Sequence, residues 1–389
     1  MEQPGQTDLF TKLVDEEWDF RMREDPIFAT LCGDHRFNDQ LPGAREDDFA
    51  RRQATMRQIH SRLEQIDRHG FPAEVHLNYD IFKRLLENEI RELEFHAYRM
   101  PIAKVGGFHT AFPEQLPFIT PFETSRDYEA YLARLAAFPR YVEDQIALMR
   151  TGLSTGYIPP RATLEGVDEA IRRQIIQEPA ESLFYRPFTQ FPALIDKVES
   201  ERLASEGCHV LMKSVMPAYE ALLRFLLEEY LPGARPEIGA AHLPDGGAFY
   251  QHRIQYFTSL PLTAEEVHAT GQAEVKRIRA EMDEVMQAVH FDGNLQAFFE
   301  YLRTDPRFYV AVPAALLKET AYVLKRMDGE LPRLFKTLPR TPYGIREIPA
   351  ASAPGNTTAF YFPPTGDGRS AGFYYVNTYD LKSRPLYEI

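Results

Sequence analysis

The sequence is poor in the features that mark several large classes of protein. Of its 389 residues only two are cysteines, Cys32 and Cys208, and they lie in no paired motif. We therefore expect neither a disulfide framework nor a zinc knuckle. No uncharged apolar run reaches the roughly 18 residues of a membrane-spanning helix. The N-terminal MEQPGQTDLF has no basic region followed by an apolar stretch, so we expect no signal peptide and a cytoplasmic location.

An excess of positive charge is also missing. Lysine and arginine total 44 against 57 for aspartate and glutamate, which gives a net charge of −13. Proteins that bind nucleic acids present a basic face or stripe, and anionic membranes attract basic segments. We therefore expect neither nucleic acid nor membrane among the partners.

Apolar residues at helical spacing dominate what is present. Hydrophobic residues make up 44% of the chain, and they recur at steps of three and four along much of it, which predicts helices. Long helices are expected over 73–98, over 263–289 and from Thr124, where Asp127 three residues later predicts a capping box. Shorter helices are expected near 8–23, 46–68, 161–177, 190–230, 294–303 and 313–336.

Two segments have the alternating pattern of strands. Residues 246–259 alternate Tyr250, His252, Ile254 and Tyr256, which favours extended structure. Residues 357–377 carry two aromatic runs around a Gly-Asp-Gly turn at 366–368, a pattern typical of a β-hairpin. The proline-rich segments 100–122 and 338–364 are expected to be irregular, either lining a cleft or wrapping the helices. The fold class is thus mainly α, with a short β-hairpin near the C-terminus.

No complete catalytic motif is visible. Residues 152–156 read GLSTG and match G-x-S-x-G, but a helix precedes them, so a helix C-terminal turn is the better interpretation. Among the eleven histidines no two lie three to five residues apart, so no helical zinc pair exists. A zinc site assembled from distant histidines, such as His109, His242 and His252, stays open as an alternative.

Several long irregular stretches resemble one bacterial family. Strings such as PFETSRDYEAYL do not recur by composition alone, and the matching stretches keep the same order along nearly the whole chain from about Glu16 onward. They resemble the "domain of unknown function 885" proteins. The stretches that carry the resemblance are 112–161, 217–235, 243–282, 302–309 and 338–349.

The resemblance implies a large helical domain similar to the cleft-type zinc peptidases, such as thimet oligopeptidase and angiotensin-converting enzyme, and a hydrolase acting on short peptides. The family's zinc signature, roughly H-E-x-x-P-G-H-H, begins a few residues after an R-P-L-Y-E segment. Here Arg384–Glu388 reads RPLYE and the sequence ends at Ile389. We therefore expect one family domain over 1–389, incomplete at its C-terminus and inactive by itself. Its expected parts are N-terminal helices (1–100), a helical body (101–337) and the proline-rich segment with the hairpin (338–389).

The resemblance implies residues that dock the substrate and implies no catalytic or metal-binding residue in this chain. No family zinc ligand can be carried over to a residue of this chain, so we expect no catalytic or metal-binding residue and no cofactor here, zinc belonging to the complete family protein. In the similar peptidases the strand before the signature pairs with extended substrate, which puts Tyr374, Tyr375 and Asn377 beside a short peptide. A metal-free peptide-binding protein stays open as the alternative function.

Overall fold

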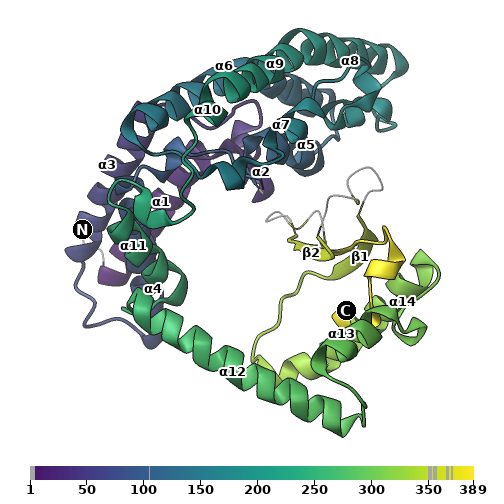
Figure 1. The fold of residues 1–389 in the computed structure, drawn as a ribbon. Helices are drawn as coiled ribbons and strands as arrows, with labels where there is room; N and C mark the ends of the chain where they lie inside the picture. The colour runs from purple at the N-terminus through teal and green to yellow at the C-terminus, as the bar shows by residue number, and fades with distance from the viewer. Residues whose placement is uncertain (1–4, 105, 349–352, 354–356, 365–367, 369–370) are drawn as a thin grey trace. The chain divides into compact units, whose positions relative to one another are not determined.

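The computed structural model describes residues 5–104, 106–348, 353, 357–364, 368 and 371–389. The fold is mainly α-helical with a small sheet close to the C-terminus, as the sequence predicts (Figure 1). The backbone divides into two compact units, an N-terminal unit of residues 1–264 and a C-terminal unit of residues 265–389. Within the described ranges, no helix combines the length and apolar character needed to cross a membrane.

The N-terminal unit is built around α6 (Ser125–Thr155), which packs along α8 and α9 (Figure 1). The predicted capping box is present: Asp127 Oδ2 accepts hydrogen bonds from the N–H and the hydroxyl of Thr124, both at 2.8 Å. The helix ends at Gly156, whose φ of 82° is left-handed, so GLSTG is a helix C-terminus. The other helices of this unit are α1 (Gln6–Glu24), α2 (Pro26–Leu31), α3 (Glu46–Glu64), α4 (Ala73–Glu94), α5 (Phe108–Ile119), α7 (Val167–Arg172), α8 (Lys197–Val210), α9 (Met216–Phe225), α10 (Leu231–Gly233) and α11 (Gly246–Thr258).

A buried arginine fastens the segment around α2 to α6. The side chain of Arg134 is fully buried, and its Nη2 donates to Pro26 O at 2.8 Å, Thr30 Oγ1 at 2.7 Å and Phe37 O at 3.0 Å. Its Nε donates to Gln40 O at 2.9 Å. The planar fork of a guanidinium can reach several fixed acceptors at once, so one side chain holds four points of this segment against the core.

Helix α5 corrects the prediction that residues 100–122 are irregular. The helix contains Pro113, which has no N–H to donate to the carbonyl of His109 four residues earlier. The hydroxyl of Tyr219 donates to that carbonyl instead, at 3.1 Å. A side chain from α9 thus replaces the missing backbone hydrogen bond, and nothing in the local sequence of α5 reveals that partner.

Helix α11 corrects the prediction of extended structure over 246–259. Phe249 and His252 both contact the ring of Phe95, at centroid distances of 5.4 and 5.5 Å. Residues three apart share one face of a helix but lie on opposite faces of a strand. Packing against Phe95 therefore requires the helix, and the alternating aromatic pattern was wrong as a guide here.

In the described part of the C-terminal unit, the α-helices α12, α13 and α14 accompany a three-stranded sheet. The helix predicted over 263–289 is confirmed as α12, and the shorter ones as α13 and α14. The predicted hairpin is confirmed by antiparallel pairing of β2 with β3. In the predicted turn at 366–368, residues 366 and 367 lie outside the described residues, and Gly368 has a left-handed φ of 73°. A further strand, β1, comes from the segment predicted to be irregular and pairs in parallel with β3. The elements are α12 (Ala264–Ala288), α13 (Leu295–Thr304), α14 (Pro313–Leu334), β1 (Tyr343–Glu347), β2 (Ala359–Phe362) and β3 (Gly372–Val376).

Candidate functional site

The sheet of the C-terminal unit carries the residues predicted to bind a peptide. Its strand order is β1-β3-β2, so β3 lies in the centre with a partner on each side. A peptide cannot add a strand to β3, because both of its edges are already paired. An extended peptide joins this sheet only along the outer edge of β1 or of β2.

The ladder of hydrogen bonds identifies the groups on the outer edge of β2. The N–H of Asn377 donates to Thr358 O at 2.9 Å, so the backbone groups of residues 358, 360 and 362 point toward β3. Those of Ala359 and Tyr361 therefore point away from it. Neither residue makes a backbone hydrogen bond on that side to any other residue that the structure describes. The outer edge of β2 thus presents N–H and C=O groups suited to a fourth strand.

Tyr374 lies on the face of the sheet that α14 covers. Tyr343 shares that face through the parallel register, and its hydroxyl donates to Asp328 Oδ1 of α14 at 2.7 Å. Beside Tyr374, side chains including Leu316 of α14 and Arg384 enclose a cavity of about 20 Å³. A cavity of this size holds a water molecule and is too small for a peptide side chain.

Tyr375 and Asn377 are held inside the fold. Tyr375 points to the opposite face and stacks on Phe360, with ring centroids 4.9 Å apart and planes inclined by 13°. Asn377 is fully buried, and its Nδ2 donates to Ala353 O at 2.8 Å and Thr357 O at 3.1 Å. Its Oδ1 accepts from the N–H of Tyr379 at 3.0 Å. The structure thus gives both side chains packing contacts, and their contact with a peptide stays a prediction.

Tyr361 is a residue that the sequence analysis did not single out. It shares a face with Tyr374, lies on the strand with the outer edge, and exposes 53% of its surface. It belongs to one of the two aromatic runs of residues 357–377, whereas the family resemblance pointed to Tyr374. The sequence pattern assigns residues to faces and cannot tell an edge strand from a central one.

The histidines of the alternative zinc site lie on separate elements. His109 belongs to α5, His242 to the 3₁₀-helix Ala240–His242, and His252 to α11. His109 is fully buried with both ring nitrogens unpartnered among the described residues, and burial lowers its pKa to about 4. Nowhere in the described part of the chain do three or more His, Cys, Asp or Glu side chains gather as a metal would require. These three histidines therefore do not form the zinc site of that hypothesis.

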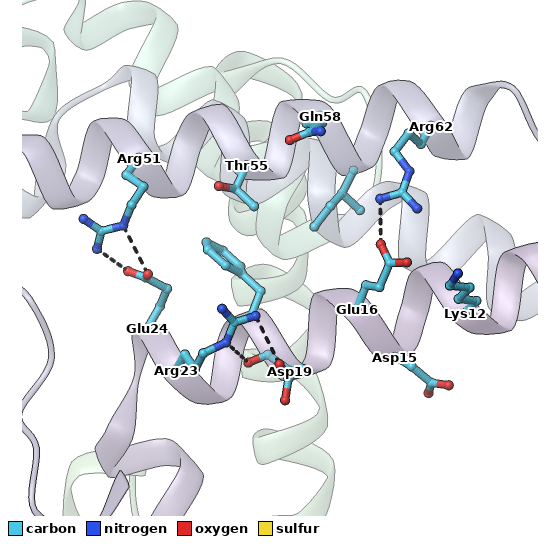
Figure 2. Close-up of a pocket in the computed structure, with 12 residues that line it drawn as sticks. Lys12, Asp15, Glu16, Asp19, Arg23, Glu24, Arg51, Thr55, Gln58 and Arg62 are labelled. Atoms are coloured by element: carbon cyan, nitrogen blue, oxygen red, sulfur yellow. Dashed lines mark hydrogen bonds and ion pairs between the residues drawn. The ribbon is translucent and has the colours of Figure 1, made fainter. Parts of the chain in front are cut away.

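A charged groove of about 720 Å³ runs between α1 and α3 (Figure 2). Figure 2 shows its cations facing carboxylates: Arg62 Nη1 lies 2.6 Å from Glu16 Oε2, and Arg51 Nη2 lies 2.9 Å from Glu24 Oε2. The hydrogen bond from Arg62 lowers the pKa of Glu16. Because these exposed charges neutralise one another across the two helices, we assign the groove to helix pairing and not to a ligand.

Comparison with known proteins identifies a family without an assigned activity. Residues 26–389 match the family described as "Bacterial protein of unknown function (DUF885)", the family that the sequence resembles. The comparison with curated proteins gave no significant match.

Two solved structures share this fold. A "putative lipoprotein" from Colwellia psychrerythraea superimposes with a TM-score of 0.89 at 18% identity, over 98% of this chain and 69% of that chain. A "putative lipoprotein of unknown function" from Shewanella oneidensis superimposes with a TM-score of 0.59 at 14% identity, over 97% of this chain and 65% of that chain. At such low identity the likeness concerns the fold alone. The present chain spans about two thirds of the length of each.

Proposed function

The chain belongs to this bacterial family of unknown function, and we propose that it forms the peptide-binding portion of a hydrolase resembling the zinc peptidases. The observation that carries the proposal is the outer edge of β2, where the backbone groups of Ala359 and Tyr361 are unpaired among the described residues. Sheet edges of this kind bind extended peptides as an additional strand. The substrate class is therefore a short peptide in extended conformation.

Strand addition would give affinity with little dependence on the sequence of the peptide. Main-chain hydrogen bonds to the edge hold the ligand, and side-chain contacts add selectivity. The exposed ring of Tyr361 extends from β2 over Gly372 of the central strand and supplies an aromatic surface on that face of the sheet. Tyr374, one strand further in, contributes mainly by supporting β2 from within the sheet.

Zinc enters this proposal only through the family resemblance. A catalytic zinc takes about three protein ligands, and the described residues bring no such set together. The residues present do not fit the metal, so we assign docking of the substrate to this chain and derive no hydrolytic step from it. A metal-free peptide-binding protein is the second candidate, and it shares the same docking edge.

A proline on the outer edge tests the proposal. Ala359→Pro removes the N–H that points away from β3 and leaves the hydrogen bonds between β2 and β3 in place, a position where edge strands tolerate proline. We expect at least tenfold weaker binding of a fluorescein-labelled mixture of hexapeptides, measured by fluorescence anisotropy. Ala359→Ser, which keeps the N–H, is the matched control and should bind as the parent chain does.

Two outcomes would refute the docking edge: no hexapeptide binding by the parent chain, or equal binding by Ala359→Pro and Ala359→Ser. Circular dichroism of both variants establishes that the helical fold is retained. The described residues bring no set of zinc ligands together, so both candidate functions predict that this chain returns the peptides intact.

A further inference from the structure

The two faces of β2 present different side chains at its outer edge. Phe360 and Phe362 lie on one face, here called the phenylalanine face, because they pair directly with Tyr375 and Phe373 of β3 in the antiparallel register. Both phenylalanines are half-buried, so each keeps part of its surface exposed. The ring of Phe360 stacks on that of Tyr375, with centroids 4.9 Å apart. The phenylalanine face is therefore apolar from the central strand out to β2.

The opposite face of β2 offers less apolar contact at the edge. Ala359 has only a methyl group there, and it lines the cavity of about 20 Å³ beside Tyr374. The ring of Tyr361 reaches from β2 over Gly372 of β3 and so extends away from the outer edge. On this face, a side chain of an added strand meets mainly the methyl group of Ala359.

The outer edge of β1 has no comparable apolar pair. Its residues on the phenylalanine face are Gly344 and Arg346, which pair with Phe373 and Tyr375. Gly344 has no side chain, and the guanidinium of Arg346 lies over the ring of Phe373, 3.5 Å from its centroid. The other face of β1 is the one that α14 covers. Apolar side chains of a peptide therefore gain more from β2 than from β1.

An added strand brings every second side chain onto the same face. Successive residues of a strand point to opposite faces, so residues two apart share one. A residue directly opposite Phe360 or Phe362 has its Cβ about 4.5–5.5 Å from that of the phenylalanine. Aromatic and β-branched side chains pair favourably with an aromatic residue at this distance. Two adjacent apolar residues cannot both use the contact, because one of them always points to the Ala359 face.

We propose, on the basis of the docking edge assigned above, that this edge selects extended peptides with bulky apolar residues two positions apart. Both side chains rest on the phenylalanine face, one beside Phe360 and the other beside Phe362. The residue between them faces Ala359 and need be neither large nor apolar. The preference holds for either direction of the peptide, because the spacing is the same from both ends.

Two isomeric peptides test this selectivity on the full chain. Fluorescein-labelled Ser-Val-Ser-Val-Ser-Lys has its valines two apart, and Ser-Val-Val-Ser-Ser-Lys, of the same composition, has them side by side. Fluorescence anisotropy should give the first peptide a Kd about threefold below that of the second, because one further aromatic–β-branched pair forms. Equal Kd values or the opposite preference would overturn the selectivity and leave the docking edge standing. No binding of either peptide would overturn both.

The variant Phe362→Ala tests which face is responsible. It removes one of the two rings, so the Kd values of the two peptides should become equal. Tyr322→Ala, which removes an exposed aromatic side chain of α14 in the same unit, is the matched control and should keep the difference of about threefold. A difference that persists in Phe362→Ala, or one that disappears in Tyr322→Ala, would contradict the assignment to the phenylalanine face.

Discussion

Acid should destabilise the N-terminal unit through His109, and replacing this residue should remove that sensitivity. The imidazole is fully buried on α5, with both ring nitrogens unpartnered among the described residues. Burial lowers its pKa from the ordinary 6.5 to about 4, because a charged ring loses its hydration there. His109→Leu takes away the titrating group at nearly the same volume.

The sign and size follow from the two pKa values. Below pH 6.5 the unfolded chain binds a proton at His109, and the folded chain does so only near pH 4. The folded state therefore loses stability as the pH falls through this window, by about 3 kcal/mol in all and by about 2 kcal/mol at pH 5. At pH 8 both states hold the neutral ring and the loss vanishes. The difference in free energy of unfolding between His109→Leu and the parent chain should thus favour the variant by about 2 kcal/mol more at pH 5 than at pH 8.

Urea unfolding at pH 5 and pH 8 measures this double difference, followed by far-UV circular dichroism and by the fluorescence of the single tryptophan, Trp18, in α1. His69→Leu, at an exposed position, is the matched control and should leave the pH dependence as it is. Subtracting the parent chain from the variant at each pH cancels the contributions of the carboxylates, and subtracting one pH from the other cancels the change in packing. An equal pH dependence in His109→Leu and the parent chain, or an NMR titration of His109 near pH 6.5, would refute the reasoning.

Three further predictions concern stability and use the same urea assay. Gly246→Ala places a Cβ 2.2 Å from the carbonyl oxygen of Ala240 and should lower the free energy of unfolding by more than about 1 kcal/mol. Gly247→Ala meets open space and should be neutral or stabilising by about 0.5 kcal/mol, so similar losses of stability in both variants would contradict the packing argument. Asp127→Ala removes the capping carboxylate of α6 and should cost about 1 kcal/mol, so an unchanged midpoint would speak against the capping role. Arg134→Lys keeps the positive charge but loses the guanidinium group that reaches four acceptors, and it should lower the free energy of unfolding by about 3 kcal/mol. A loss of stability below about 1 kcal/mol would mean that the guanidinium group is dispensable.

Helix period and local capping explain why much of the fold could be predicted. In α4, which lies within the helix predicted over 73–98, Tyr79, Phe82 and Leu86 recur at steps of three and four and are buried. In α6 the capping box involves residues three apart in the chain, so it can be recognised from the local sequence alone. Such features depend on neighbours along the chain and need no knowledge of the tertiary structure.

The errors occur where a distant residue determines the local structure. Helix α5 tolerates Pro113 because Tyr219, more than a hundred residues away, donates to the carbonyl that proline leaves without a partner. Residues 246–258 form helix α11 and not the predicted extended structure, because two side chains on one helix face pack against Phe95. Propensity is a weak guide when tertiary contacts of this kind oppose it.

The candidate site illustrates the same limit in the sheet. Tyr374 and Tyr375 lie on opposite faces of the sheet, as neighbouring residues of any strand do. Which strand is central depends on β1, and its run Tyr343–Glu347 contains a glycine and two charged residues with no clear alternation. Once β1 pairs with β3, the outer edges of the sheet belong to β1 and β2, and the exposed aromatic residue of β2 is Tyr361. Peptide docking therefore stays a proposal about the sheet, and the residues that would meet the peptide depend on a strand that the sequence pattern did not reveal.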